Sequence, residues 1–239
     1  MTDGYAELQA LSNFSFLEGG SHAEELVNQA KALGLAALGI ADRNTLAGVV
    51  RAHVAAKEAG LQLIVGARLD LMEGISLVLY PEDRAAYGRL STLLTIGKGR
   101  AEKGACHLWL EDVYQHAGGQ VVIALPPPEE AAFETQLEEL CRRLPEPPYL
   151  AASYLHKGDD RAYLARLADL AARTGAKLLA VNDVLYHAPA RRPLADVLAC
   201  IREGVKISEA GFLLEANAER HLKSPAEMAR LFKGYEDAL

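Results

Sequence analysis

The stretch from Tyr5 to Gly48 constrains the fold most strongly, because it predicts two strands that flank a helix. Tyr5 to Leu11 alternates between apolar and polar residues, which is typical of a strand. A second, apolar strand is predicted over Leu35–Ile40, and it runs into the polar residues Asp42 and Arg43. A βαβ unit of this kind makes two parallel strands and places the loops that follow them at the same edge of the sheet. Ligands and catalytic groups gather at that edge in α/β folds.

Start and stop signals frame the helix between these strands. Ser21 precedes the helical stretch and Glu24 follows three residues later, a pair that predicts a capping box at the helix N-terminus. The helix is expected to run to Leu33, because Gly34 can adopt the left-handed conformation that ends many helices. All three elements of the unit are therefore predicted from local signals.

The composition excludes several classes of protein. Half of the 239 residues are hydrophobic, which suffices for the core of one large domain. No run of about 18 uncharged apolar residues is present, and the N-terminus lacks the basic and apolar segments of an export signal, so we expect no membrane association. The three cysteines are far apart and form no CxxC motif, which is typical of a reduced, cytoplasmic protein. The net charge of −7 argues against independent DNA binding, because nucleic-acid affinity depends largely on neutralising phosphates.

The remainder of the chain continues the alternation of strands and helices. A third strand is expected over Leu61–Val65, and it continues through Leu69–Met72 into a hairpin with Ile75–Tyr80. Further strands are expected over Gln120–Leu125, Tyr149–Tyr154 and Lys177–Val181, and helices over Thr45–Ala59, from Pro81 to about Ile96, Glu129–Leu144 and Asp159–Thr174. About seven strands separated mostly by helices predict an α/β fold with a largely parallel sheet. Closure into a barrel would remove the exposed edges, although the alternation alone does not separate a barrel from an open, doubly wound sheet.

The alternation of strands and helices ends before Pro193, and only helices are predicted after it. A helix is predicted over Leu194–Glu203, and Ser224 begins a final helix that is expected to continue to Leu239. No strand is expected in this part of the chain. We therefore expect a barrel domain over 1–204, followed by a short helical extension over 205–239 that begins a further domain.

The polar residues that follow the predicted strands resemble the metal-binding positions of the PHP domains, the polymerase and histidinol phosphatase family. Active members are seven-stranded α/β barrels that carry His-x-His after the first strand, Asp-His after the second, Gly-x-Glu after the third and Asn-Asp-x-His near the end, and these side chains hold metal ions that hydrolyse phosphate esters. Similarity to this family implies the same barrel here. The matching positions in this chain are Gln9, Leu11, Asp42, Arg43, Arg68, Asp183 and Leu185.

Most of these residues cannot bind a metal ion as the family's residues do. Leucine has no donor atom, and arginine is always charged and cannot act as a ligand. His156 and His187 follow strands, but the partners that a metal would need are missing. We therefore expect no metal cofactor and no catalytic residue in this domain.

The two arginines suggest that side-chain charge has replaced metal charge. We hypothesise that Arg43 and Arg68 neutralise Asp42 and Asp183 in one cluster at the mouth of the barrel. The alternative is that these are four unrelated surface charges at the ends of strands.

Four longer segments narrow the resemblance to one branch of the family. They are similar to the N-terminal region of error-prone bacterial C-family DNA polymerases of the ImuC type: LSNFSFLEGGSHAEELV, ADRNTLAGVVRAHVAAKEAG, VNDVLYHAPARRPLADVLACIREGVKI and NAERHLKSPAEMARLF. This resemblance implies a part in translesion synthesis, with palm, thumb and fingers domains following in the same chain and magnesium bound in the palm. DNA would be held by those domains, and the sliding clamp and proteins of the mutagenesis complex are implied partners.

Two other functions are weighed against a non-catalytic polymerase module. One is an active metal-dependent phosphoesterase, either a proofreading nuclease or a hydrolase of small phosphate esters, which needs a bound transition metal. The other is a free-standing binding protein. We disfavour it because the final helix is expected to be still running at Leu239.

Overall fold

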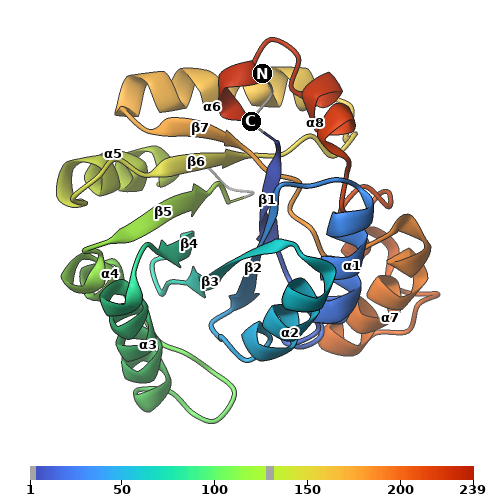
Figure 1. Cartoon of the computed structure of the whole chain (residues 1–239), viewed down its shortest axis with the longest axis horizontal. Coiled ribbons are helices and arrows are strands. Elements are labelled where there is room, and N and C mark those ends of the chain that lie inside the picture. Colours follow the sequence, from blue (N-terminus) through green and yellow to red (C-terminus); the bar gives the residue numbers. More distant parts are fainter. Residues whose placement is uncertain (1–3, 128–131) are drawn as a thin grey trace.

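The computed structural model, which describes residues 4–127 and 132–239, contains a single seven-stranded sheet in the order β1-β2-β3-β4-β5-β6-β7 (Figure 1). Strand β4 pairs antiparallel with β3 and β5, and the other neighbouring strands pair in parallel. The strands are β1 (Ala6–Ala10), β2 (Ala37–Arg43), β3 (Gln62–Asp70), β4 (Ser76–Pro81), β5 (Gln120–Leu125), β6 (Tyr149–Ala152) and β7 (Lys177–Ala180).

Helices connect most of the strands and cover the outer face of the curled sheet (Figure 1). They are α1 (Ala23–Ala32), α2 (Val49–Ala59), α3 (Arg84–Gly99), α4 (Leu110–His116), α5 (Phe133–Arg143), α6 (Asp160–Thr174), α7 (Arg192–Glu203) and α8 (Pro225–Leu231). Within the described ranges, a helix long and apolar enough to cross a membrane does not occur.

Backbone hydrogen bonds join the two ends of the sheet. The amide of Leu11 donates to the carbonyl of Val184 over 2.9 Å, and the amide of Val184 donates to the carbonyl of Gln9 over 2.8 Å. Ala10 and Val184 form a parallel bridge, so the segment after β7 lies against β1. The predicted seven-stranded α/β barrel is therefore confirmed, with this short bridge at its seam.

The sheet separates two apolar clusters. The larger one packs the outward side chains of the strands, such as Leu38 and Leu77, against helical residues such as Leu26 and Leu90. The smaller one gathers side chains of β2, β4, β5 and β6 inside the barrel, with Val78 and Ile123 among its buried members. Because side chains alternate along a strand, these four strands contribute buried residues to both clusters.

Tyr80 fixes the width of the barrel interior. Its hydroxyl donates a 2.8 Å hydrogen bond to the carbonyl of Leu8 across the barrel. A Cβ atom at Gly39 would lie 2.3 Å from this hydroxyl, and one at Gly66 would lie 2.4 Å from the ring. The glycines of β2 and β3 are therefore required because the tyrosine ring occupies the space that their side chains would fill.

Several predicted helix boundaries were wrong. His22, not Ser21, is the N-cap of α1, and its backbone amide donates a 2.9 Å hydrogen bond to the carboxylate of Glu25. The hydroxyl of Ser21 instead accepts a hydrogen bond from the backbone amide of His187 and also forms a hydrogen bond with its imidazole ring. Pro81 ends β4, and α3 begins after Asp83, whose carboxylate caps the helix. The start of the helix predicted at Glu129 lies outside the described residues.

The final helix is shorter than predicted. Helix α8 ends at Leu231, and Gly234, with φ of 92°, follows in a left-handed conformation that stops the helix before Leu239. Met228 and Phe232 from this region are fully buried in the larger apolar cluster. The division of the chain between residues 204 and 205 stays a prediction.

Glu7 is a buried carboxyl group beside the seam. Its carboxylate accepts hydrogen bonds from the Tyr5 hydroxyl at 2.8 Å and from the backbone amides of Gln9 and Asn182 at 2.8 and 3.0 Å. Burial outweighs these hydrogen bonds and raises the pKa of Glu7 from 4.5 to about 7. The folded chain therefore keeps a proton that the unfolded chain releases at lower pH.

Substituting Glu7→Gln is expected to flatten the pH dependence of stability. As pH rises from the unfolded pKa towards the folded pKa, the folded state binds more protons than the unfolded state, so the free energy of unfolding falls. For this group the fall amounts to about 3 kcal/mol, and the neutral amide removes it. Urea unfolding of both proteins at pH 5 and pH 8 measures the difference. Equal pH dependence of the two proteins would contradict this role of Glu7.

Candidate functional site

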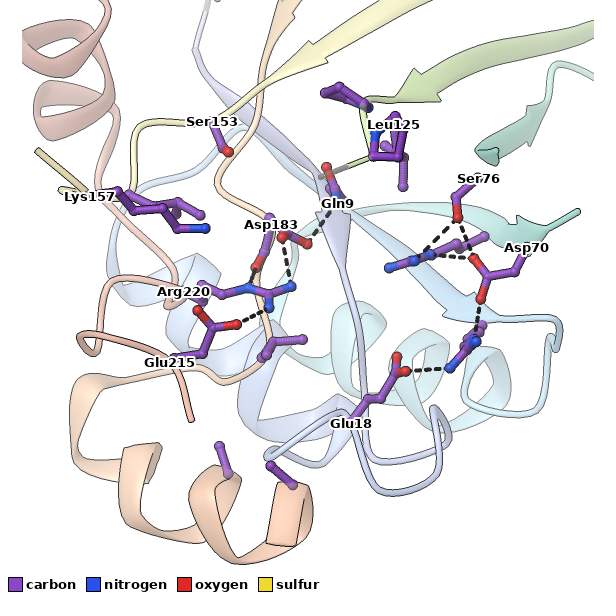
Figure 2. Close-up of a pocket in the computed structure, with 18 of the residues that line it drawn as sticks. Gln9, Glu18, Asp70, Ser76, Leu125, Ser153, Lys157, Asp183, Glu215 and Arg220 are labelled. Atoms are coloured by element: carbon purple, nitrogen blue, oxygen red, sulfur yellow. Dashed lines mark hydrogen bonds and ion pairs between the residues drawn. The ribbon is translucent and has the colours of Figure 1, made fainter. Parts of the chain in front are cut away.

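The carboxyl ends of the parallel strands surround a pocket of about 890 Å³ (Figure 2). Every strand except the reversed β4 approaches it with its final residues or with the loop that follows, and α7 lies over one side. The predicted convergence of the strand ends is therefore confirmed. Of the seven sequence positions singled out as equivalent to metal ligands, five line this pocket: Gln9, Arg43, Arg68, Asp183 and Leu185.

The other two positions lie beneath the surface. Leu11 is 1% exposed and belongs to the buried core, where its amide helps to close the seam. Asp42 is also 1% exposed. Its carboxylate accepts three hydrogen bonds, from the amide and hydroxyl of Ser12 at 2.8 and 2.7 Å and from the hydroxyl of Ser15 at 2.8 Å. Asp42 thus holds the loop after β1 against the end of β2.

Burial raises the pKa of Asp42, although the hydrogen bonds from the two serines oppose this effect. The surroundings leave little room for another ligand, because a Cβ atom at Gly48 would lie 2.4 Å from one carboxylate oxygen. The carboxylate is therefore enclosed by groups that already use its acceptor oxygens.

Asp183 forms the centre of one charged cluster in the pocket (Figure 2). Arg220 lies 2.6 Å from its carboxylate through Nη2 and donates from Nε to its backbone carbonyl at 3.0 Å. The amide group of Gln9 donates to the other carboxylate oxygen at 2.7 Å, and Glu215 pairs with Arg220 at 2.7 Å. Asp183 has a φ of 47°, a left-handed conformation that aspartate tolerates better than most residues.

Arg220 is held firmly in its charged form. Burial lowers the pKa of its guanidinium, but the carboxylates of Asp183 and Glu215 more than compensate and raise the pKa above its ordinary value. The side chain of Arg220 is only 17% exposed, so solvent screens these interactions weakly. A permanent cation therefore lies against the aspartate that the resemblance identified as a metal ligand.

A second charged cluster surrounds Asp70 on the opposite side of the pocket (Figure 2). Its carboxylate accepts hydrogen bonds from Arg68 Nε at 2.8 Å and Ser76 Oγ at 2.6 Å, and it also pairs with Arg43. Arg43 reaches Glu18 as well. Burial alone would raise the pKa of Asp70, but Arg68, Ser76 and Arg43 together hold it below the ordinary value.

The pairing proposed from the sequence was wrong. Arg43 and Arg68 pair with Asp70 and Glu18, whereas Asp42 is bound by serines and Asp183 by Arg220. The β2–β3 register places Arg43 opposite Arg68, and Asp70 follows two residues later on the same face of β3. Asp42 precedes Arg43 by one residue, so it points to the other face of β2.

Sequence reasoning missed Asp70, Glu215 and Arg220. Asp70 carried a usable signal, because residues two apart on a strand share a face and Asp70 follows Arg68 by two. Arg220 and Glu215 carried no such signal, since both were placed in an extension that was expected to belong to another domain.

The residues at the barrel mouth do not fit the metal cluster found in active members of the family that the sequence resembles. Leu11 and Leu185 offer no donor atom, and Arg43 and Arg68 bring positive charge to positions where the family has ligands. In the described part of the chain, no group of three or more His, Cys, Asp or Glu side chains is placed to hold a metal ion.

Solved structures with a similar fold include hydrolytic enzymes. A candidate metal-dependent phosphoesterase from Bifidobacterium adolescentis superposes with a TM-score of 0.59 at 17% sequence identity, covering 76% of this chain and 87% of the other. The lesion-specific endonuclease of Pyrococcus furiosus superposes with a TM-score of 0.54 at 13% identity, covering 77% of this chain and 48% of the other. At these identities the likeness shows the fold alone.

Curated relatives are much closer in sequence. The chain is 55% identical to the error-prone DNA polymerase of Caulobacter vibrioides and 49% identical to that of Brucella abortus, in each case over 98% of this chain. It matches their N-terminal region and spans about 22% of their length. The family model described as "PHP domain" matches residues 7–218. The chain therefore belongs to the PHP domain family.

Proposed function

We propose that this chain is the PHP part of an error-prone DNA polymerase that copies damaged DNA, and that it acts there as a structural module without phosphoesterase activity. The identity of 49–55% to error-prone DNA polymerases over almost the whole chain supports the first half of the proposal. The side chains at the barrel mouth support the second half.

The observation that carries the non-catalytic role is the ion pair between Arg220 and Asp183. A divalent cation at Asp183 would have to displace a guanidinium that lies 2.6 Å away and stays protonated. It would also gain few new ligands, because Gln9 already donates to the second oxygen and Leu185 has no donor atom. Arginine thus supplies the positive charge that the carboxylates need, without the Lewis acidity that phosphate ester hydrolysis needs.

Polymerisation would belong to the parts of the relatives that this chain does not span. We propose that palm, thumb and fingers domains of the same polymerase hold the DNA and bind the catalytic magnesium. The sliding clamp and proteins of the mutagenesis complex are further proposed partners, and the cytoplasm is the proposed compartment. The net charge of −7 fits a domain that leaves DNA binding to its neighbours.

The purified chain is expected to contain no stoichiometric transition metal and to release no phosphate or nucleotide. The reason is that its barrel mouth lacks a ligand set for a metal cluster. Elemental analysis of protein purified without chelator, combined with nuclease and phosphatase assays in added Mn²⁺ or Zn²⁺, provides the measurement. Stoichiometric metal together with phosphate ester cleavage would overturn the non-catalytic role.

Replacing Asp42 is expected to affect stability alone. Asp42→Ala leaves the amide and hydroxyl of Ser12 and the hydroxyl of Ser15 without their buried acceptor, at a cost of about 2–4 kcal/mol in the free energy of unfolding. Asp42→Asn keeps one acceptor oxygen and should cost less. Urea unfolding measures both effects. A change in metal content without a loss of stability would instead identify Asp42 as a ligand.

A hybrid enzyme tests the link to error-prone polymerases. This chain is placed in the Caulobacter vibrioides enzyme in exchange for the region it matches. Because 55% identity preserves a fold and most of its packing surfaces, the hybrid is expected to extend primers on damaged templates at a rate close to that of the parent enzyme. A hybrid that folds, as judged by thermal unfolding, but does not extend primers would contradict the assignment.

A further inference from the structure

Helix α7 presents apolar side chains to solvent. Leu194, Val197 and Ile201 are 41%, 43% and 60% exposed, and their spacing of three and four residues places them on one face of the helix. Other residues of the helix face inwards: Ala195 and Ala199 line the pocket, and Cys200 is buried. The exposed apolar side chains are therefore not the ones that attach α7 to the barrel.

The segment after α7 also exposes apolar side chains. Ile207, Phe212 and Leu213 are 57%, 108% and 53% exposed. Leu213 lines the pocket together with Ala195 and Ala199, so it lies towards the inner side of α7. We refer to Leu194, Val197 and Ile201 together as the α7 face.

A neighbouring loop adds a further exposed aromatic residue. The guanidinium of Arg202, in the last turn of α7, donates to the carbonyl of Leu17 at 3.1 Å. The preceding residue, Phe16, is 82% exposed. The hydrogen bond joins the loop after β1, which carries Phe16, to the last turn of α7.

The composition of this surface indicates a protein partner. Single exposed apolar residues are common, but a contiguous apolar group along one helix face often marks a site of protein contact. The charged residues around the α7 face are of both signs, and Arg202–Glu203 and Lys206–Glu209 pair with one another. Such a border leaves no excess positive charge for phosphates, so a nucleic acid is a poor occupant.

We propose that the α7 face docks against the part of the polymerase that this chain does not span, and so fixes the barrel to the catalytic portion. This inference rests on the proposed function. Most of the length of the curated relatives lies outside the matched region, so a large partner is covalently attached in a protein of that kind. Attachment gives the partner a high effective concentration, so a modest apolar surface suffices for docking.

A second copy of this chain is a weaker candidate for the same surface. Stable association of separate proteins buries about 800 Å² on each partner and requires a self-complementary surface. Neither requirement applies to a domain of the same chain, because interfaces within a chain can be small and need no symmetry. The covalent partner is therefore the occupant to which the proposal commits.

Hydrogen exchange compares the α7 face with and without its proposed partner. Amide exchange is measured by mass spectrometry over residues 194–213 in the 239-residue chain and in the hybrid polymerase. Docking is expected to slow exchange in this region by about tenfold or more in the hybrid, because burial restricts local opening. Helix α2, whose Val50 and Val54 are 72% and 51% exposed, serves as the reference region and should exchange equally in both proteins.

Paired substitutions separate docking from folding. Val197→Asp with Ile201→Asp places two charges on the α7 face, and Val50→Asp with Val54→Asp makes the same chemical change on α2. Both double variants should leave the unfolding temperature of the 239-residue chain nearly unchanged, because the substituted side chains are exposed. In the hybrid, only the α7 pair is expected to abolish the slowed exchange and to lower primer extension.

Each outcome has a distinct meaning. A hybrid that extends primers without slower exchange at 194–213 would overturn the docking proposal and leave the proposed function intact. A folded hybrid that fails to extend primers would count against the proposed function itself. Dimerisation of the isolated chain in light scattering, lost in the α7 pair, would assign the face to a second copy and overturn the proposal.

Discussion

The interaction between Arg220 and Asp183 connects the closure of the barrel to the chemistry of its mouth. Arg220 binds both the carboxylate and the backbone carbonyl of Asp183, in the segment that leads from β7 to the seam with β1. It comes from a part of the chain 37 residues further on, so it also fastens the C-terminal region onto the barrel. The side chain of Arg220 thus neutralises Asp183, whose backbone is in a left-handed conformation, and attaches the C-terminal region to this segment.

The barrel mouth is balanced by arginine–carboxylate pairs. Asp183 and Glu215 surround Arg220 on one side, and Asp70 and Glu18 engage Arg43 and Arg68 on the other. Removing one member of the Arg220–Asp183 pair, which is largely shielded from solvent, leaves an uncompensated charge, and this is costly even where the intact pair contributes little net stability. This arrangement fits the structural, non-catalytic role that we propose for the domain.

The sequence allowed the general architecture to be predicted because its signals are local. Alternating strands and helices, glycine at helix ends and polar residues after strands predicted seven strands and the convergence of their ends. The partners of individual side chains could not be predicted in the same way. Asp42 was assigned to the mouth because it follows a strand, but the direction of its side chain depends on where β2 ends, and β2 continues to Arg43. Ser21 matched a capping signal, yet its contact with His187, which is distant in sequence, shifted the cap by one residue.

We expect arginine side chains, and not metal ions, to supply the positive charge in the barrel mouth. Anomalous X-ray scattering from crystals of the 239-residue chain grown with Mn²⁺ or Zn²⁺ measures this most directly. The expected result is an Arg220–Asp183 pair in place and no anomalous peak within bonding distance of Asp183. A peak at about 2.0–2.2 Å from this carboxylate, with Arg220 displaced, would contradict the central claim.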